Sequence, residues 1–111
     1  MDNFINFVFS ETIDLPFKVI EYFSEFNSYS SEKKHSICGE TDNLVSLGNS
    51  EYRSGNLKGA IEFYHKALNI HPINNDALQN MYVCYQKLGM NDKNMHVEIV
   101  WNCVKQLKGI I

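Results

Sequence analysis

Hydrophobic and polar positions alternate along this chain with a helical period. Apolar residues return every three or four positions over long stretches, and strand-like alternation never lasts for more than a few residues. The two prolines, Pro16 and Pro72, stand where a helix can begin or end. The pattern therefore predicts an all-α protein.

The segment 1–29 predicts additional N-terminal helices with many aromatic side chains. A short helix with Phe4 and Phe7 on one side is expected first, and a second helix is expected to begin near Leu15. Burying one large apolar side chain contributes about 1.5–3 kcal/mol. We therefore expect residues 1–29 to pack on the rest of the chain or on a partner chain. The segment holds eight of the fourteen aromatic residues: Phe4, Phe7, Phe9, Phe17, Tyr22, Phe23, Phe26 and Tyr29.

Residues 30–40 are polar and charged, and we interpret them as a linker. From residue 41 the helical pattern becomes regular and is punctuated by Gly55, Pro72 and Gly89. This punctuation divides residues 41–107 into two helix–turn–helix units. The four helices are expected over residues 41–54, 57–70, 77–88 and 91–107.

These two units repeat with a period of about 34 residues, a length typical of stacked helical repeats. Leu44 recurs as Leu78, and Gly55 recurs as Gly89. One repeat cannot bury its own apolar face, and about three stacked units are normally needed for stability. This chain offers two, so we expect the aromatic segment 1–29 to form a third helical layer, in the same chain or on a partner chain.

The segment 41–74 resembles a repeat of the tetratricopeptide (TPR) family. That family's pattern is Trp-x2-Leu-Gly-x2-Tyr, then Ala-x3-Phe, then Pro. In this chain Leu44 stands at the Trp position, and Glu51 stands at the Tyr position with Tyr52 beside it. The positions that fit the pattern are Leu47, Gly48, Gly55, Ala60, Tyr64, Ala67 and Pro72.

The segment 75–107 resembles a degenerate second repeat. At strict spacing its last helix does not fit the pattern, and a turn longer by three residues would correct the register. Val97, Trp101 and Val104 would then take the places of Ala60, Tyr64 and Ala67. The turn would absorb the insertion over residues 90–94.

The resemblance implies TPR-like helical hairpins that form a fragment of a right-handed α-solenoid. Solenoids of this kind bind through a concave surface, which in TPR units is lined by the first helix of each pair. Asparagine, glutamine and basic side chains there suit an extended peptide, because its backbone offers both donors and acceptors. The implied partner-binding residues are Asp42, Val45, Asn49, Tyr52 and Arg53 in the first unit, and Asp76, Gln79, Asn80, Val83, Gln86 and Lys87 in the second.

The function that this resemblance implies is non-catalytic docking of a peptide or helix of another protein. One alternative is a structural assembly subunit, including a homodimer, built through the aromatic N-terminal segment. Another is a co-chaperone-type adaptor with an incomplete carboxylate clamp. Asn49 and Asn80 fall at the two asparagine positions of that clamp, whereas Val45 falls where the clamp has a lysine.

Composition and charge narrow the function classes further. With 111 residues and a formal net charge of −3, the chain is one small domain without the basic excess of a nucleic-acid-binding protein. No apolar run approaches the ~20 residues that span a bilayer, and the N-terminus lacks the basic start of a secretory signal. Three cysteines, an odd number, favour a reducing compartment, so we expect a cytoplasmic protein.

Motifs for catalysis or for metal binding are not recognisable in the chain. There is no glycine-rich phosphate loop, nucleophile elbow or carboxylate pair on one helix face. His35 and Cys38 supply two metal ligands, whereas a structural zinc site needs four. We therefore expect no enzyme activity, no metal and no cofactor.

Overall fold

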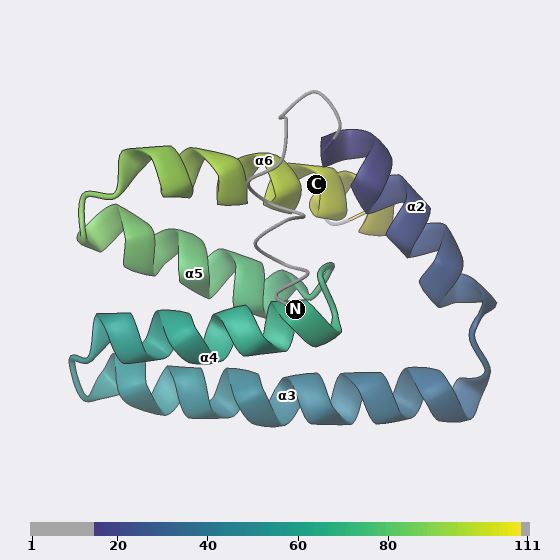
Figure 1. The fold of residues 1–111 in the computed structure, drawn as a ribbon, viewed down its shortest axis with the longest axis horizontal. Coiled ribbons are helices and arrows are strands. Elements are labelled where there is room, and N and C mark those ends of the chain that lie inside the picture. Colours follow the sequence, from purple (N-terminus) through teal and green to yellow (C-terminus); the bar gives the residue numbers. More distant parts are fainter. Residues whose placement is uncertain (1–14, 110–111) are drawn as a thin grey trace.

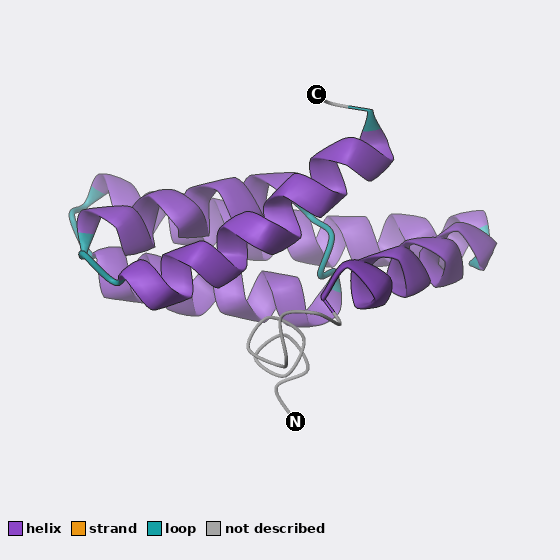
Figure 2. Cartoon of the chain, turned by 90° about the horizontal axis from the view of Figure 1, so that it is seen from above, coloured by secondary structure: helices purple, strands orange, loops and turns teal. Residues whose placement is uncertain are grey.

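The computed structural model describes residues 15–109, and this part of the chain is all-α. The predicted helix with Phe4 and Phe7 lies outside the described residues. The five helices are α2 (Leu15–Ser28), α3 (Ser31–Arg53), α4 (Leu57–Ile70), α5 (Asn75–Lys87) and α6 (Asn91–Lys108). Short turns join them (Figure 2).

Consecutive helices from α3 to α6 pack as adjacent antiparallel pairs (Figure 1). Because each turn reverses the chain, α3 and α5 run in the same direction and end at the same edge of the molecule. The α2 helix does not continue this series. It leads from the C-terminal part of α6, against which it packs, to the start of α3.

The core lies between these helices and is mainly aliphatic. Each of α2 to α6 contributes at least one buried side chain to it. Within residues 15–109, no helix combines the length and the hydropathy needed to cross a membrane. The fully buried apolar side chains include Val19, Ala60, Ala67, Leu68, Ala77, Leu78, Met81, Cys84, Val97, Val100 and Val104.

Helix α2 packs on the remainder of the same chain. Val19 is fully buried, and the ring of Phe26 lies 4.5 Å from the ring of His71, centroid to centroid. The hydroxyl of Tyr22 shares a hydrogen bond with Nδ1 of His71 at 3.0 Å. The aromatic stripe of α2, formed by Tyr22, Phe23 and Phe26, is therefore half-buried within one chain, against the end of α4 and against α6.

The expected linker over residues 30–40 is wrong, because this segment forms the first turns of α3. Ser30 caps the helix, accepting a hydrogen bond on Oγ from the backbone N–H of Lys33 at 3.2 Å. Glu32 in the first turn adds a favourable interaction with the helix dipole. The segment is polar because α3, with 23 residues, is much longer than its neighbour α4, with 14. Polarity here reflects exposure of a helix and not a break in it.

The two hairpin turns, α3–α4 and α5–α6, have the same backbone geometry at the spacing that the repeat predicts. Gly55 and Gly89 follow the helix ends with φ of 89° and 70°. Each glycine N–H donates to the carbonyl three residues earlier, at 3.0 and 3.1 Å. The next N–H donates to the carbonyl five residues earlier, at 2.9 and 3.0 Å. These bonds satisfy the carbonyls that a helix end leaves open, and the positive φ favours glycine at both places.

The second turn is not longer by three residues, so that prediction is wrong. Helix α4 begins at Leu57 and helix α6 begins at Asn91. The two starts are separated by the same interval as Gly55 and Gly89, so the second turn contains no insertion. Val97 and Val104 are fully buried as expected, but Trp101 is half-buried and packs on Tyr82 with ring centroids 5.5 Å apart. The fully buried residues of α6 are Val97, Val100 and Val104, and this helix contacts α2 as well as α5.

Candidate functional site

Six side chains from α3, α4 and α5 surround a hollow of about 340 Å³. Five of them were predicted from the sequence to bind a partner, and Tyr64 on α4 is the addition. The hollow opens between the two helices that run in parallel. Its lining residues are Asn49, Tyr52, Arg53, Tyr64, Asn80 and Val83.

Asn49 stands at the centre of a hydrogen-bond network in this hollow. Its Oδ1 accepts a hydrogen bond from the hydroxyl of Tyr64 at 2.6 Å. The same oxygen accepts a second hydrogen bond from Nδ2 of Asn80 at 2.9 Å. One side chain from each of three helices is thereby held in place, so the polar groups of the hollow are preorganised.

Gly48 explains how Tyr64 reaches Asn49. A Cβ at Gly48 would lie 2.5 Å from Cε1 of Tyr64, well inside contact distance. Because Gly48 has no side chain, the ring of Tyr64 can pack directly against the backbone of α3. Only 1% of Tyr64 is exposed, and burial raises its pKa to about 12. The hydroxyl consequently stays protonated as a hydrogen-bond donor at neutral pH.

Two basic side chains lie at the end of the hollow where α3 and α5 terminate. Arg53 occupies the last turn of α3 and lines the hollow. Lys87 occupies the last turn of α5, and its Nζ lies 5.1 Å from the ring centroid of Tyr52. A hydrogen bond with Tyr52 raises the pKa of Lys87 further above its ordinary value. Cations are favoured at these helix ends by the helix dipole.

The remaining predicted residues do not line the hollow. Asp42, Gln79 and Gln86 are exposed on α3 and α5. Val45 is only 7% exposed and belongs to the hydrophobic core, so the prediction that it contacts a partner is wrong. The side chain at this position faces inward because α3 packs against α4 and α5 along its apolar stripe.

Two other hollows are lined in a different way. One, of about 440 Å³, is lined by the consecutive residues 89–93 of the α5–α6 turn. The other, of about 200 Å³, lies between α2 and α6 and includes Ile20 and Leu107. Neither combines hydrogen-bonding side chains from three helices as the α3–α5 hollow does.

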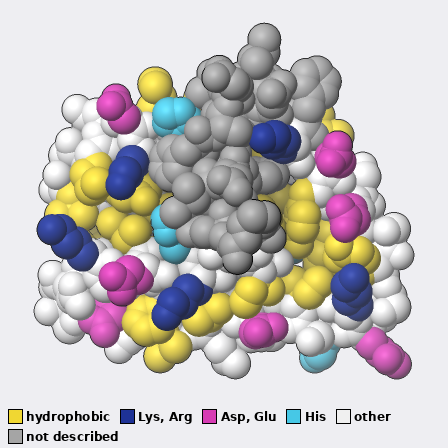
Figure 3. Space-filling view, viewed as in Figure 1, with side chains coloured by type: hydrophobic (Ala, Val, Ile, Leu, Met, Phe, Trp, Pro, Cys, Tyr) yellow, Lys and Arg dark blue, Asp and Glu magenta, His cyan; other side chains and the backbone are white. Residues whose placement is uncertain are grey.

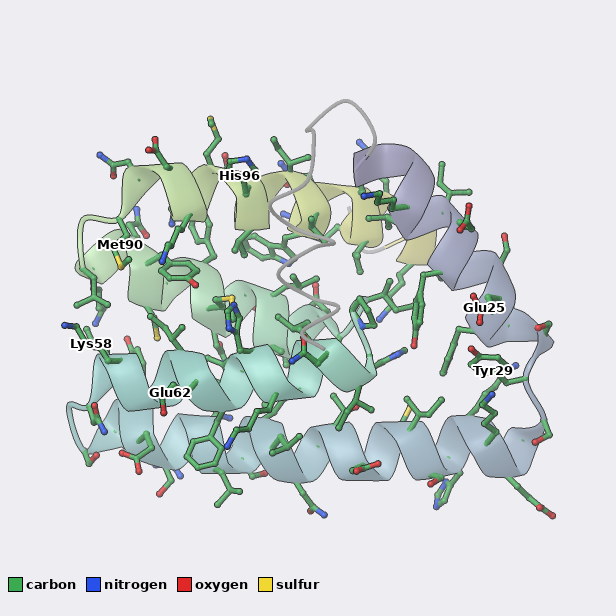
Figure 4. The ribbon with its side chains drawn as sticks, in the orientation of Figure 1. Glu25, Tyr29, Lys58, Glu62, Met90 and His96 are labelled. Carbon is green, nitrogen blue, oxygen red and sulfur yellow. The ribbon has the colours of Figure 1, made fainter. Side chains whose placement is uncertain are left out.

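The face of the molecule seen in Figure 3 carries side chains of both charge signs. Figure 4 labels Lys58 and Glu62 on α4 and His96 on α6. Outside the grey region, acidic and basic side chains are interspersed over this face (Figure 3). At the end of α2, the hydroxyl of Tyr29 donates to Oε1 of Glu25 at 2.7 Å. Hydrophobic side chains lie between the charged ones on this face (Figure 3).

The side chains of residues 15–109 form no recognisable metal site. No three histidine, cysteine or acidic side chains of this part of the chain are placed to hold one metal ion. The three cysteines, Cys38, Cys84 and Cys103, carry free thiols.

A comparison of the chain with protein-family models, with curated proteins and with solved structures found no match. The resemblance to TPR repeats therefore stays a prediction from the residues of this chain.

Proposed function

We propose that this protein is a non-catalytic interaction module that holds a peptide segment of another protein in the α3–α5 hollow. The proposal includes the finer fold assignment: two TPR-like units, over residues 41–74 and 75–107, that form a fragment of a right-handed solenoid. Helices α3 and α5 would be the first helices of the two units.

The repeated turns support the two-unit assignment. Gly55 and Gly89 stand one repeat period apart, with the same conformation and the same pattern of hydrogen bonds. The parallel course of α3 and α5 also agrees with it (Figure 1). Stacked helical repeats place equivalent helices side by side in this way.

The observation that carries the functional proposal is the network around Asn49. Because Oδ1 of Asn49 accepts both hydrogen bonds, its Nδ2 group is left to donate toward a ligand. Asn80 uses its Nδ2 in the network, which leaves its Oδ1 as an acceptor. An extended peptide offers both carbonyls and N–H groups along its backbone, and an asparagine amide can pair with either.

The two alternative functions have less support from the geometry. A carboxylate clamp needs a cation at position 45, and Val45 lies in the core. Assembly through the aromatic N-terminal segment would use the stripe on α2, which here packs on α6 and His71 of the same chain. The α3–α5 hollow, in contrast, has polar groups directed into it.

Substitution of Asn49 by aspartate tests the proposal directly. Asn49→Asp keeps an acceptor for Tyr64 and for Asn80 but removes the amide donor. Retention of a displayed library of short unstructured peptides should fall about two- to tenfold, since one hydrogen bond is lost and contributes about 0.5–1.5 kcal/mol. Asn43→Asp is the matched control, because it makes the same charge change at an exposed position of α3.

The result is decisive when both variants are compared with the parent protein. Equal loss of peptide retention in Asn49→Asp and Asn43→Asp would show that the change acts through charge alone. Unchanged retention in Asn49→Asp, with helicity intact by circular dichroism, would place peptide binding outside the hollow.

A further inference from the structure

The two helices beside the hollow carry charges of the same sign at equivalent positions. Asp42 on α3 corresponds to Asp76 on α5, one repeat period further along the chain. Arg53 corresponds to Lys87 by the same interval. Each helix therefore presents an acid near one end of this stretch and a base at the other.

Helical geometry places these charges on the side of the helix that faces the hollow. The interval from Asp42 to Arg53 is about three helical turns, so both lie on one face of α3, together with Asn49 between them. The same spacing relates Asp76 to Lys87 on α5. Because α3 and α5 run in parallel, both acids lie at one end and both bases at the other (Figure 1).

The basic end is the better defined of the two. Arg53 lines the hollow, and Lys87 lies against Tyr52, another lining residue. At the acidic end, both aspartates are exposed. Burial lowers the pKa of Lys108, and the charge of Asp76 is one of those that oppose this shift. Because the Lys108 cation offsets part of the charge of Asp76, we take Asp42 as the acidic position of the site.

We propose, on the basis of the function proposed above, that the occupant of the hollow is an extended peptide with opposite charges at its two ends. An acidic residue of the peptide lies at Arg53 and Lys87, at one end of the hollow. The peptide continues beyond the hollow along α3, so that a basic residue lies at Asp42. At a rise of about 1.5 Å per helical residue, the charged ends are roughly 16 Å apart. An extended chain covers this distance in about five residues.

This charge arrangement selects against two other partners. A nucleic-acid strand carries negative charge at every phosphate, which Asp42 and Asp76 would repel. A uniformly acidic peptide meets the same repulsion at one end. Charge complementarity of this kind contributes to partner choice and to orientation in the site.

Three synthetic peptides of equal length test the inference. They share an uncharged central sequence of serine, asparagine and leucine, and they carry two charged residues five positions apart. One peptide has a lysine and a glutamate, one has two glutamates and one has two lysines. By fluorescence anisotropy at low salt, the mixed peptide should bind roughly three- to tenfold more tightly than the other two.

A double charge reversal shows whether the basic end is responsible. In Arg53→Glu/Lys87→Glu the charges at both ends of the proposed peptide path are acidic, so the preference should move to the peptide with two lysines. The matched control is Lys58→Glu/Lys93→Glu, which makes the same change in net charge at two exposed positions away from the hollow. This control should keep the preference for the mixed peptide.

The outcomes separate this inference from the proposed function. Equal affinity for all three peptides, weakened in each case by Asn49→Asp, would overturn the charge selection and leave peptide binding in place. If the protein retains none of the three peptides and also no member of the displayed library, both proposals are overturned.

Discussion

The two helical hairpins of this protein share a turn but differ where their helices cross. In the α3–α4 hairpin, Gly48 faces Tyr64, and the tyrosine is buried. At the equivalent positions of the α5–α6 hairpin stand Tyr82 and Glu98. A hydrogen bond with Glu98 raises the pKa of Tyr82. One crossing is therefore closed and buried, and the other is polar and partly exposed.

This difference locates the candidate site in the first hairpin. The small residue at position 48 lets Tyr64 reach Asn49 and fix its orientation. In the second hairpin the aromatic ring is on α5 instead, where it packs on Trp101, and Nε1 of Trp101 donates to Oδ1 of Asn75 at 2.8 Å. The shared turn sets how the helices meet, whereas the side chains at the crossing decide whether a preorganised hollow forms.

The largest expected effect comes from truncating Tyr64, the buried side chain at the crossing of α3 and α4. Tyr64→Ala should lower the free energy of unfolding by about 3–5 kcal/mol, because it removes a large buried side chain and leaves a cavity. Glu98→Ala, at the equivalent position, should change it by less than about 1 kcal/mol. Urea denaturation of both variants gives the comparison. Similar losses would show that the two crossings are energetically alike.

The α3–α4 hairpin ends in His71, which is buried against α2. The α5–α6 hairpin has no histidine at the equivalent position, residue 105. Burial, with a further contribution from the Lys108 cation, lowers the pKa of His71 from 6.5 to about 4. The unfolded chain therefore binds more protons between these values, so stability should fall as the pH is lowered from 6.5 to 4. The loss that His71 contributes should be about 2–3 kcal/mol, because each pKa unit corresponds to about 1.4 kcal/mol.

Substitution of His71 isolates this contribution. His71→Gln offers an amide to the hydroxyl of Tyr22 but does not titrate, so the dependence of stability on pH should be shallower over this interval. Denaturation curves at several pH values measure it. An identical slope in the parent protein and in the variant would show that His71 does not drive the loss.

Adding one methyl group at the closed crossing is the next test. Gly48→Ala should destabilise the protein by about 1–3 kcal/mol, because the new Cβ would lie 2.5 and 2.8 Å from carbons of the Tyr64 ring. Gly39→Ala on the same helix is the control, since nothing lies within 4 Å of a Cβ there. It should stabilise the helix by up to about 1 kcal/mol. Chemical denaturation in which both variants gain stability would contradict the close packing at Gly48.

The smallest expected effect tests the feature that the two hairpins share. Gly55→Ala and Gly89→Ala should each destabilise by about 1 kcal/mol, because both residues have positive φ and neither Cβ would meet another atom within 4 Å. The two thermal melting temperatures should fall by similar amounts. A clear difference between them would mean that the turns are not energetically equivalent.

Much of the candidate site was predictable, although through a family resemblance and not from chemistry alone. Asn49, Arg53 and Asn80 were expected on the binding surface, and they line the hollow. Tyr64 was not expected there, because its match to the repeat pattern assigned it to packing between helices. The signal that could have identified it is the pairing of a glycine with a large polar aromatic across one helix crossing.

The sequence by itself determined the local elements of this protein. The bounds of α4 follow from Asn56, whose side chain accepts a hydrogen bond from the N–H of Gly59 at 3.1 Å, and from Pro72 beyond its end. The turns at Gly55 and Gly89 depend on backbone bonds that span at most five residues. Such features are readable because the groups that interact are close together in the chain.

Only the tertiary structure decided which faces of these helices are covered. Residues 30–40 are polar and yet helical, and Val45 is buried although it was expected on the binding surface. Helix α2 packs on α6 and on His71, which are distant from it in the chain. Spacing along a sequence shows that a face is apolar but not which distant segment covers it, since burial depends on the packing of all the helices at once.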